Sequence, residues 1–282
     1  MVIDFFGGYK MKKILALLLA MFMIAALVAC SNKGNTEDNA LETLGLNDNS
    51  FTNNNIGTFT YEVSADGHYE ITKYIVNTSV EHEVVIPETI QDVDVTSIAA
   101  DAFKSCTSVT AITIPETVKY IGDFAFYDCD KLTKITLPDS VIEIGTGAFR
   151  GCDLLNNVTL PSSLAEVADQ LFWECPSLSN ITFGNAVTVI GEGAFFNCDA
   201  LTSMVIPETV KEIKASAFYD CDSLVSITVP KTVATIGDAA FADITAEKVT
   251  FNAKTGSYFE TYFADIYGIN DKEYAHYEIK VD

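Results

Sequence analysis

Six cysteines recur at one unvarying spacing, and cysteine is the residue type in this chain with the widest choice of chemistry. Each follows the previous one by 23 residues: Cys106, Cys129, Cys152, Cys175, Cys198 and Cys221. Thiols can pair as disulfides, bind a metal ion or react as nucleophiles. The chain has no Cys-x-x-Cys motif and no histidine beside these cysteines, which argues against a metal centre.

The same spacing argues that the cysteines occupy one structural position. Ile244 stands 23 residues after Cys221, where a further cysteine would fall. An aliphatic side chain there indicates an apolar, inward-facing slot, and a free cysteine packs as a small hydrophobic residue. Strands stacked about 4.8 Å apart would also permit disulfides between neighbours, so cross-linking is the alternative. We predict six buried free thiols.

Carboxylates flank the cysteines and are candidates for calcium binding: Asp128, Asp130, Asp153, Glu174, Asp199, Asp220 and Asp222. Calcium requires about six to eight oxygens around one point. One or two carboxylates per repeat favour a solvated acidic edge instead. The chain also lacks a nucleophile elbow, a phosphate loop and a zinc-protease helix. These observations predict a protein that is not an enzyme and has no cofactor or metal.

Seven phenylalanines keep the 23-residue period: Phe103, Phe126, Phe149, Phe172, Phe195, Phe218 and Phe241. A strict period of this length identifies a repeat protein. One such unit cannot bury enough apolar surface to fold alone, so successive units must stack. The sequence therefore predicts a solenoid with a parallel sheet along one side.

Each unit has a short strand followed by a corner. In the clearest unit, residues 134–137 alternate and read as a strand, which Pro138 ends because proline cannot donate to a sheet ladder. Val141 and Ile144 are spaced like one turn of an α- or 3₁₀-helix. We expect Gly145 to adopt a positive φ angle.

The repeated unit AF-x-x-C-x-x-L-x-x-I-x-I-P-x-x-V-x-x-I-G resembles the BspA-like leucine-rich repeat family, from roughly Val84 to Phe251. The resemblance implies a leucine-rich-repeat right-handed superhelix with a parallel β-sheet on one face. It also implies a surface-exposed bacterial protein that binds or adheres and performs no catalysis. Residues 257–268 resemble the closing helix of this family, with Ser257 as N-cap and Gly268 just beyond the C-terminus.

The N-terminus carries a targeting signal. Two lysines, Lys12 and Lys13, precede an apolar run, Ile14 to Ala29, that is short for a membrane span. The run ends in Leu-Val-Ala-Cys30, which resembles the lipobox of bacterial lipoproteins. This resemblance implies cleavage before Cys30 and lipid attachment to its thiol; an ordinary cleaved signal peptide is the alternative. Met11 is a second candidate for the start of translation.

Five segments follow from these patterns. We expect a lipoprotein signal peptide at 1–29, a flexible Asn-rich tether at 30–57, a β-hairpin cap at 58–83, repeats at 84–251 and a C-terminal cap with a helix at 252–282. The hairpin prediction rests on alternating residues on both sides of an Asp-Gly pair.

Two columns should point outward from the strands. One is rich in threonine: Thr113, Thr136, Thr159, Thr182 and Thr228. Its neighbour is small and polar: Ala111, Lys134, Asn157, Asn180, Ser203 and Ser226. Threonine is favoured in any strand, so a merely solvated face is one interpretation. The other is a flat hydrogen-bonding surface for a protein or glycan ligand.

The residue after each repeat phenylalanine forms a third column: Lys104, Tyr127, Arg150, Trp173, Phe196 and Tyr219. Aromatic and arginine side chains are the usual hot spots of interfaces. We therefore select Tyr127, Trp173, Phe196 and Tyr219 as candidate contact residues. The alternative is that these rings pack over the adjacent ridge.

Charge narrows the range of partners. The net charge is −22, with 39 acidic and 17 basic residues. Nucleic acid and anionic membrane surfaces would be repelled, so contact with a membrane is expected only through the lipid anchor. We expect an exported, lipid-anchored binding or adhesion protein on the bacterial cell surface. The alternative is a structural or assembly module of the cell envelope without an external ligand.

Overall fold

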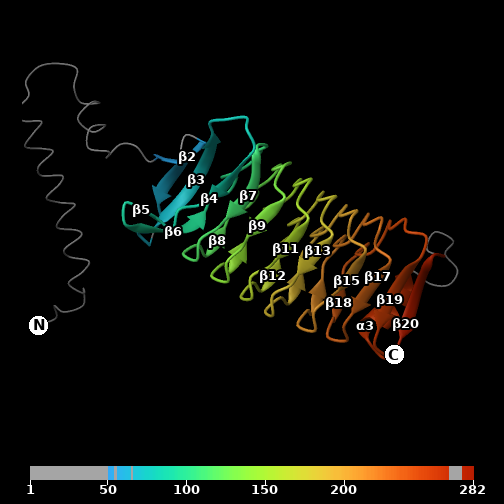
Figure 1. Ribbon diagram of the computed structural model, residues 1–282. Coiled ribbons are helices and arrows are strands. Elements are labelled where there is room, and N and C mark those ends of the chain that lie inside the picture. The colour runs from blue at the N-terminus through green and yellow to red at the C-terminus, as the bar shows by residue number, and fades with distance from the viewer. Residues whose placement is uncertain (1–49, 54–55, 65, 267–274) are drawn as a thin grey trace, which may run out of the picture. The chain divides into compact units, whose positions relative to one another are not determined.

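The fold is a stack of similar turns. The computed structural model describes residues 50–53, 56–64, 66–266 and 275–282. These residues belong to one compact unit, Asn49–Asp282. Figure 1 shows the chain passing through the same short strands and corners turn after turn. The predicted repeat solenoid is confirmed.

Parallel strands form the first side of every turn. One group comprises β4 (His82–Val85), β7 (Val109–Thr113), β9 (Lys134–Thr136), β11 (Asn157–Thr159) and β13 (Asn180–Thr182). The other comprises β15 (Ser203–Val205), β17 (Ser226–Val229), β19 (Val249–Ala253) and β20 (Tyr277–Val281). Within the repeats, paired residues are one period apart, as in Asn157 opposite Asn180. The parallel sheet that the alternating residues predicted is therefore confirmed.

A second parallel ladder follows the proline corner, and the expected helical turn there was wrong. One group comprises β6 (Val93–Ile98), β8 (Tyr120–Ile121) and β10 (Glu143–Ile144). The other comprises β12 (Glu166–Val167), β14 (Val189–Ile190), β16 (Glu212–Ile213) and β18 (Thr235–Ile236). The turn closes earlier, because the Val141 N–H donates to the Pro138 carbonyl at 3.1 Å. The chain is extended again when it reaches Ile144. The three-residue spacing of Val141 and Ile144 therefore reflects a residue at the end of a turn and a residue in the next strand, not two residues of one helical turn.

The remaining side of each turn is also hydrogen-bonded to its neighbour. The N–H groups of Phe124, Phe126 and Asp128 each donate to carbonyls of the next turn. Every second N–H is directed this way because two residues per turn adopt a positive φ. One column is Asp101, Phe124, Gly147, Gln170, Gly193, Ser216 and Ala239; the other is Ser105, Asp128, Gly151, Glu174, Asn197, Asp220 and Asp243.

Gly145 does not belong to either column, so its predicted positive φ was wrong. A Cβ at Gly145 would lie 2.5 Å from the backbone nitrogen of Asp123 on the preceding turn. Glycine is therefore favoured at this position because two backbones approach each other closely, which is its other common use. Ala168 and Lys214 stand at the equivalent position of other turns, and neither has a positive φ.

The core is a continuous stack of phenylalanine rings. All seven repeat phenylalanines are fully buried, and neighbouring rings have centroids 5.1–5.6 Å apart. Tyr74 and Phe59 extend the stack at its N-terminal end, and Phe251 and Phe259 at its C-terminal end. Since each turn leaves its rings open above and below, the caps must supply the last aromatic contacts.

The N-terminal cap is larger than the predicted hairpin. β2 (Gly57–Val63) and β3 (Tyr69–Val76) pair antiparallel, as expected from the Asp-Gly turn. However, β1 (Ser50–Asn53) adds a third antiparallel strand. β1 lies inside the segment 30–57 that we expected to be a tether, so the ordered fold begins earlier than predicted. The rest of that segment up to 49 lies outside the described residues.

The C-terminal cap contains the predicted helix, α3 (Tyr258–Ile266). Ser257 acts as its N-cap, since Oγ accepts a hydrogen bond from the Glu260 N–H at 3.3 Å. The carboxylate of Glu260 accepts the Gly256 N–H at 2.7 Å in return. Gly268, the expected residue after the helix, lies outside the described residues.

Candidate functional site

The predicted threonine column exists on the outward face of the parallel sheet. The register places Thr113 opposite Thr136 and Thr159 opposite Thr182. Val205 continues the column and lies opposite Thr228. The side chains of this column are exposed from Thr113 to Val205 and half-buried at Thr228. The structure thus brings all five selected threonines onto one face.

The neighbouring column completes a surface that carries very little charge. Its residues from Lys134 to Ser203 are exposed, and Ala111 and Ser226 are half-buried. We name the combined surface the sheet face: residues 111, 113, 134, 136, 157, 159, 180, 182, 203, 205, 226 and 228. It offers hydroxyl and amide groups, one lysine and no carboxylate. Val205 is its most apolar point, with 69% of its area exposed.

The aromatic column is one continuous stack, and its rings are half-buried. The rings of Trp173 and Phe196 are parallel with centroids 3.9 Å apart, and Phe196 stacks on Tyr219 at 5.0 Å. Arg150 lies over the Trp173 ring at 5.1 Å and over the Tyr127 ring at 5.9 Å. Each ring therefore has at least one face covered by a neighbouring ring or by Arg150, as the packing alternative predicted.

Backbone shape makes room for the largest ring. Gly193 has a positive φ of 58°, and a Cβ there would lie 2.6 Å from the Trp173 ring. The Arg150 side chain is fixed on the same stack, donating from Nη1 to Gln170 Oε1 at 3.0 Å. Sequence reasoning placed these residues in one column but missed the cation held between two rings. A contact role for Tyr127, Trp173, Phe196 and Tyr219 stays a prediction.

The six repeat cysteines are buried free thiols, as predicted. From the second turn onward each Sγ donates to a phenylalanine carbonyl of the preceding turn at 3.0–3.2 Å. Burial raises the pKa of Cys175 and of Cys221 to about 12. A thiol that is buried and protonated is neither a nucleophile nor a metal ligand. These side chains therefore belong to the packing of the stack.

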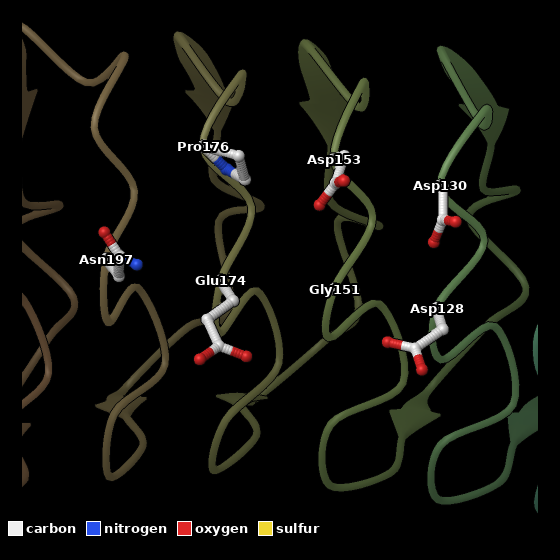
Figure 2. Close-up of a pocket in the computed structure, with 7 residues that line it drawn as sticks. All are labelled: Asp128, Asp130, Gly151, Asp153, Glu174, Pro176 and Asn197. Carbon is white, nitrogen blue, oxygen red and sulfur yellow. The ribbon is translucent and has the colours of Figure 1, made fainter.

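An acidic groove crosses the turns just before β9, β11 and β13. It has a volume of about 480 Å³ and is lined by Asp128, Asp130, Gly151, Asp153, Glu174, Pro176 and Asn197. Figure 2 shows these residues in two rows that repeat from turn to turn, with the carboxylates of neighbouring turns separated. Within the described part of the chain, no group of three His, Cys, Asp or Glu side chains is placed to hold a metal ion.

The predicted lipid attachment site lies outside the described residues. This holds for Cys30 and for the whole of segment 1–29, so lipidation stays a prediction. Among the residues that are described, no helix has the length and apolar character needed to cross a membrane.

Solved structures of bacterial leucine-rich repeat proteins resemble this chain. One from Bacteroides ovatus has a TM-score of 0.53 and 28% identity, with 74% of this chain and 62% of that chain covered. The T. pallidum leucine rich repeat protein has a TM-score of 0.44 and 28% identity, covering 72% and 86%. A leucine rich cell surface protein of Faecalibacterium prausnitzii has a TM-score of 0.42 and 25% identity, covering 71% and 76%.

The match to the Bacteroides ovatus structure supports the fold, and the chain spans about three fifths of that protein's length. No curated protein matches the chain. The model of the BspA type leucine rich repeat region matches residues 70–202 and 188–276, with 6 copies. This range includes the aromatic column and all the parallel strands of the repeats, and it ends just before β20. The chain therefore belongs to the BspA type leucine rich repeat family.

Proposed function

We propose that this chain is a lipid-anchored protein of the bacterial cell surface that binds another protein through the sheet face. One observation carries the proposal. In a chain with net charge −22, six consecutive turns present an outward surface without a carboxylate. Depletion of charge is what distinguishes the core of a protein interface from ordinary surface. Val205, exposed in the middle of polar neighbours, provides the apolar centre that such a core requires.

A protein ligand fits this surface better than a glycan does. Sugar rings bind by stacking on an exposed aromatic face, and the sheet face contains no aromatic residue. The rings of the aromatic column lie face to face with one another, with Trp173 and Phe196 only 3.9 Å apart. Hydroxyl and amide side chains around an apolar centre suit the mixed surface of a folded protein. Membership of a leucine-rich repeat family, whose members commonly serve in protein interaction, supports the same conclusion.

The first test places negative charge on the sheet face. The double variant Thr182→Glu/Val205→Glu is expected to lose at least tenfold in affinity for a protein ligand, because two carboxylates would be buried without partners. The purified full chain is applied to arrays of extracellular matrix proteins, cell-envelope proteins and glycans. The matched control is Ala165→Glu/Ala234→Glu, which adds the same charge at exposed positions beside the second ladder.

Three outcomes of this test would contradict the proposal. Equal losses in the two double variants would indicate a general charge effect. Undiminished binding by the sheet-face variant would place the site elsewhere. Binding to glycans alone would replace the protein ligand with a carbohydrate. Recovery of only the producing cell's own envelope proteins would favour the structural module over the adhesin.

The second test concerns the anchor. The change Cys30→Ser is expected to move the protein from the membrane pellet to the soluble or secreted fraction, because it removes the only thiol in the lipobox. Fractionation followed by immunoblotting measures the shift, and incorporation of labelled fatty acid measures lipidation directly. Ser31→Ala serves as control and keeps the anchor. Membrane retention of the Cys30→Ser variant would count against lipid anchoring.

A further inference from the structure

The sheet face has an acidic border on the side where its strands begin and a partly acidic border on the other side. On the side where the strands begin, Asp130 and Asp153 occupy the same position of neighbouring turns, four residues before β9 and β11 (Figure 2). Pro176 interrupts this row, and Asp199 and Asp222 continue it toward the C-terminus. The acidic groove is therefore the edge of the sheet face, not a separate surface.

The second border follows the strands. Glu116, Asp139 and Glu208 each come directly after the proline that ends a strand, and all three are exposed. The equivalent positions of the other turns hold Ser162, Asn185 and Lys231, so this border is acidic only in part. On the sheet face itself Lys134 is the single charged residue, at the N-terminal end. From β11 to β15 the exposed surface is uncharged in the middle and bordered by carboxylates on the strand-start side.

Among the described residues, Glu174 is the only carboxylate of the groove that forms an ion pair within the chain. Burial raises the pKa of Asp153, and the nearby carboxylates raise it further: Asp130, Asp128 and Glu174. The same pattern recurs at Asp220, where burial is followed by repulsion from Asp222, Asp243 and Asp199. Arg150 Nη2 pairs with Glu174 at 3.7 Å, and its guanidinium is also held over the Trp173 ring.

We propose that the protein bound by the sheet face is basic at its borders, with lysine or arginine side chains flanking an uncharged centre. The inference rests on the proposed function, because it describes what surrounds the site on the sheet face. Complementary charges at the rim of an interface steer the encounter and fix its register, while the uncharged centre supplies the packing. Cations brought by the partner would relieve the repulsion among the carboxylates at each turn.

The length of the acidic border suits a macromolecule better than a metal ion. The carboxylates are spread over successive turns, and calcium needs about six to eight oxygens around one point. An extended row of single charges, spread over several turns, matches several cations that are carried on one protein surface. A nucleic acid or a phosphorylated ligand would meet the same row as a repulsive barrier.

The test uses defined peptides, since the natural partner is unknown. Two sets of 20-residue peptides share uncharged Ser/Thr/Val centres and differ in their flanks, which are Lys/Arg in one set and Asp/Glu in the other. The purified full chain is expected to bind members of the basic-flanked set at least tenfold more tightly in 50 mM salt. That preference should shrink in 500 mM salt, because rim charges are screened.

A pair of matched variants separates a local border from overall charge. The border variant is Asp130→Asn/Asp153→Asn/Glu174→Gln. The control variant is Glu143→Gln/Glu192→Gln/Asp238→Asn, which removes three exposed charges elsewhere on the turns. We expect the border variant to lose most of the tenfold preference and the control to keep it.

Each remaining outcome has one meaning. Equal affinity of wild type for both peptide sets, no binding to either set, or equal losses in the two variants overturns the inference. If the border variant loses binding while Thr182→Glu/Val205→Glu binds like wild type, the sheet face is not the site, and the proposed function fails instead. If the sheet-face variant alone loses binding, the proposed function stands and the basic partner is wrong.

Discussion

Raising the pH from 8 to 10 is expected to unfold the repeat domain in one steep transition. In an unfolded chain a thiol ionises with a pKa of about 8.5. In the fold, burial raises the pKa of Cys106 to about 11, that of Cys175 and Cys221 to about 12, and that of the other three further. The folded state therefore holds all six protons at a pH where the unfolded state has released them.

The sign and size of the effect follow from proton linkage. A group whose pKa is raised by folding contributes its full stability below the unfolded pKa and loses it as the pH rises above that value. Each thiol then costs about 1.4 kcal/mol per pH unit, and six thiols together cost about 8 kcal/mol per pH unit. Since domains are stable by about 5–15 kcal/mol, the transition should fall within one to two units above the ordinary thiol pKa.

Urea unfolding followed by circular dichroism, in reducing buffer at pH 7.5, 8.5 and 9.5, measures this loss. The matched variant Cys175→Val removes one of the six protons and follows the precedent of Ile244 in the same slot. Its free energy of unfolding should fall with pH about one sixth less steeply. A midpoint that stays constant up to pH 9.5, or an equal slope in the variant, would show that the thiols do not control alkaline stability.

The columns could be predicted from the sequence because the period fixes them. Once residues 23 positions apart are stacked, inward and outward positions follow from alternation within each strand. The inward slot of Cys152, the outward position of Thr159 and the ring column of Trp173 all follow in this way. The period also identifies Ile244 as the residue that ends the cysteine column.

The features that the sequence did not predict depend on contacts between turns. The strand Glu143–Ile144 has two residues, too few to show alternation. Gly145 is required by the backbone of the preceding turn, and its own neighbours in sequence do not reveal that requirement. The position of Arg150 between two rings depends on side-chain conformations. The acidic edge, in contrast, was predicted from the carboxylates beside the cysteines, and the structure shows that part of it is a groove.

The end of the cysteine column is closed by a residue that does not belong to the 23-residue repeat. Each thiol from Cys129 to Cys221 satisfies a phenylalanine carbonyl of the preceding turn. At the last repeat turn the donor is not a thiol: the hydroxyl of Tyr277 donates to the Phe241 carbonyl at 2.8 Å. The hydroxyl oxygen of Tyr277 in turn accepts the N–H of Ile244 at 3.2 Å. The last turn is thus closed by a residue that lies 33 positions beyond Ile244 and has no counterpart in the repeat.

The substitution Phe172→Ala is expected to destabilise the domain by about 4–8 kcal/mol. The ring is fully buried and lies 5.6 Å from Phe149 and 5.5 Å from Phe195, centroid to centroid. Deleting a buried phenylalanine side chain costs about 3–5 kcal/mol, and each lost aromatic pair adds about 0.5–1.5 kcal/mol. Urea unfolding at pH 7 measures the change in the free energy of unfolding.

The matched control is Phe196→Ala, which deletes the same side chain from the half-buried aromatic column. That ring stacks on Trp173 and Tyr219 but keeps part of its area in solvent, so a loss of about 1–2 kcal/mol is expected. Equal losses in the two variants would contradict the assignment of the phenylalanine stack as the main source of coupling between turns.

The position of Phe172 in the middle of the stack predicts a change in cooperativity as well as in stability. In a linear array each turn is stabilised by its two neighbours, so a cavity at one turn weakens the interface on both of its sides. The turns before and after Phe172 should then unfold separately, and the urea transition should broaden with a lower m-value. The equivalent change at Phe241, beside the C-terminal cap, should leave a longer uninterrupted array and one sharp transition. A sharp transition with an unchanged m-value in Phe172→Ala would mean that the two ladders couple the turns without help from the ring stack.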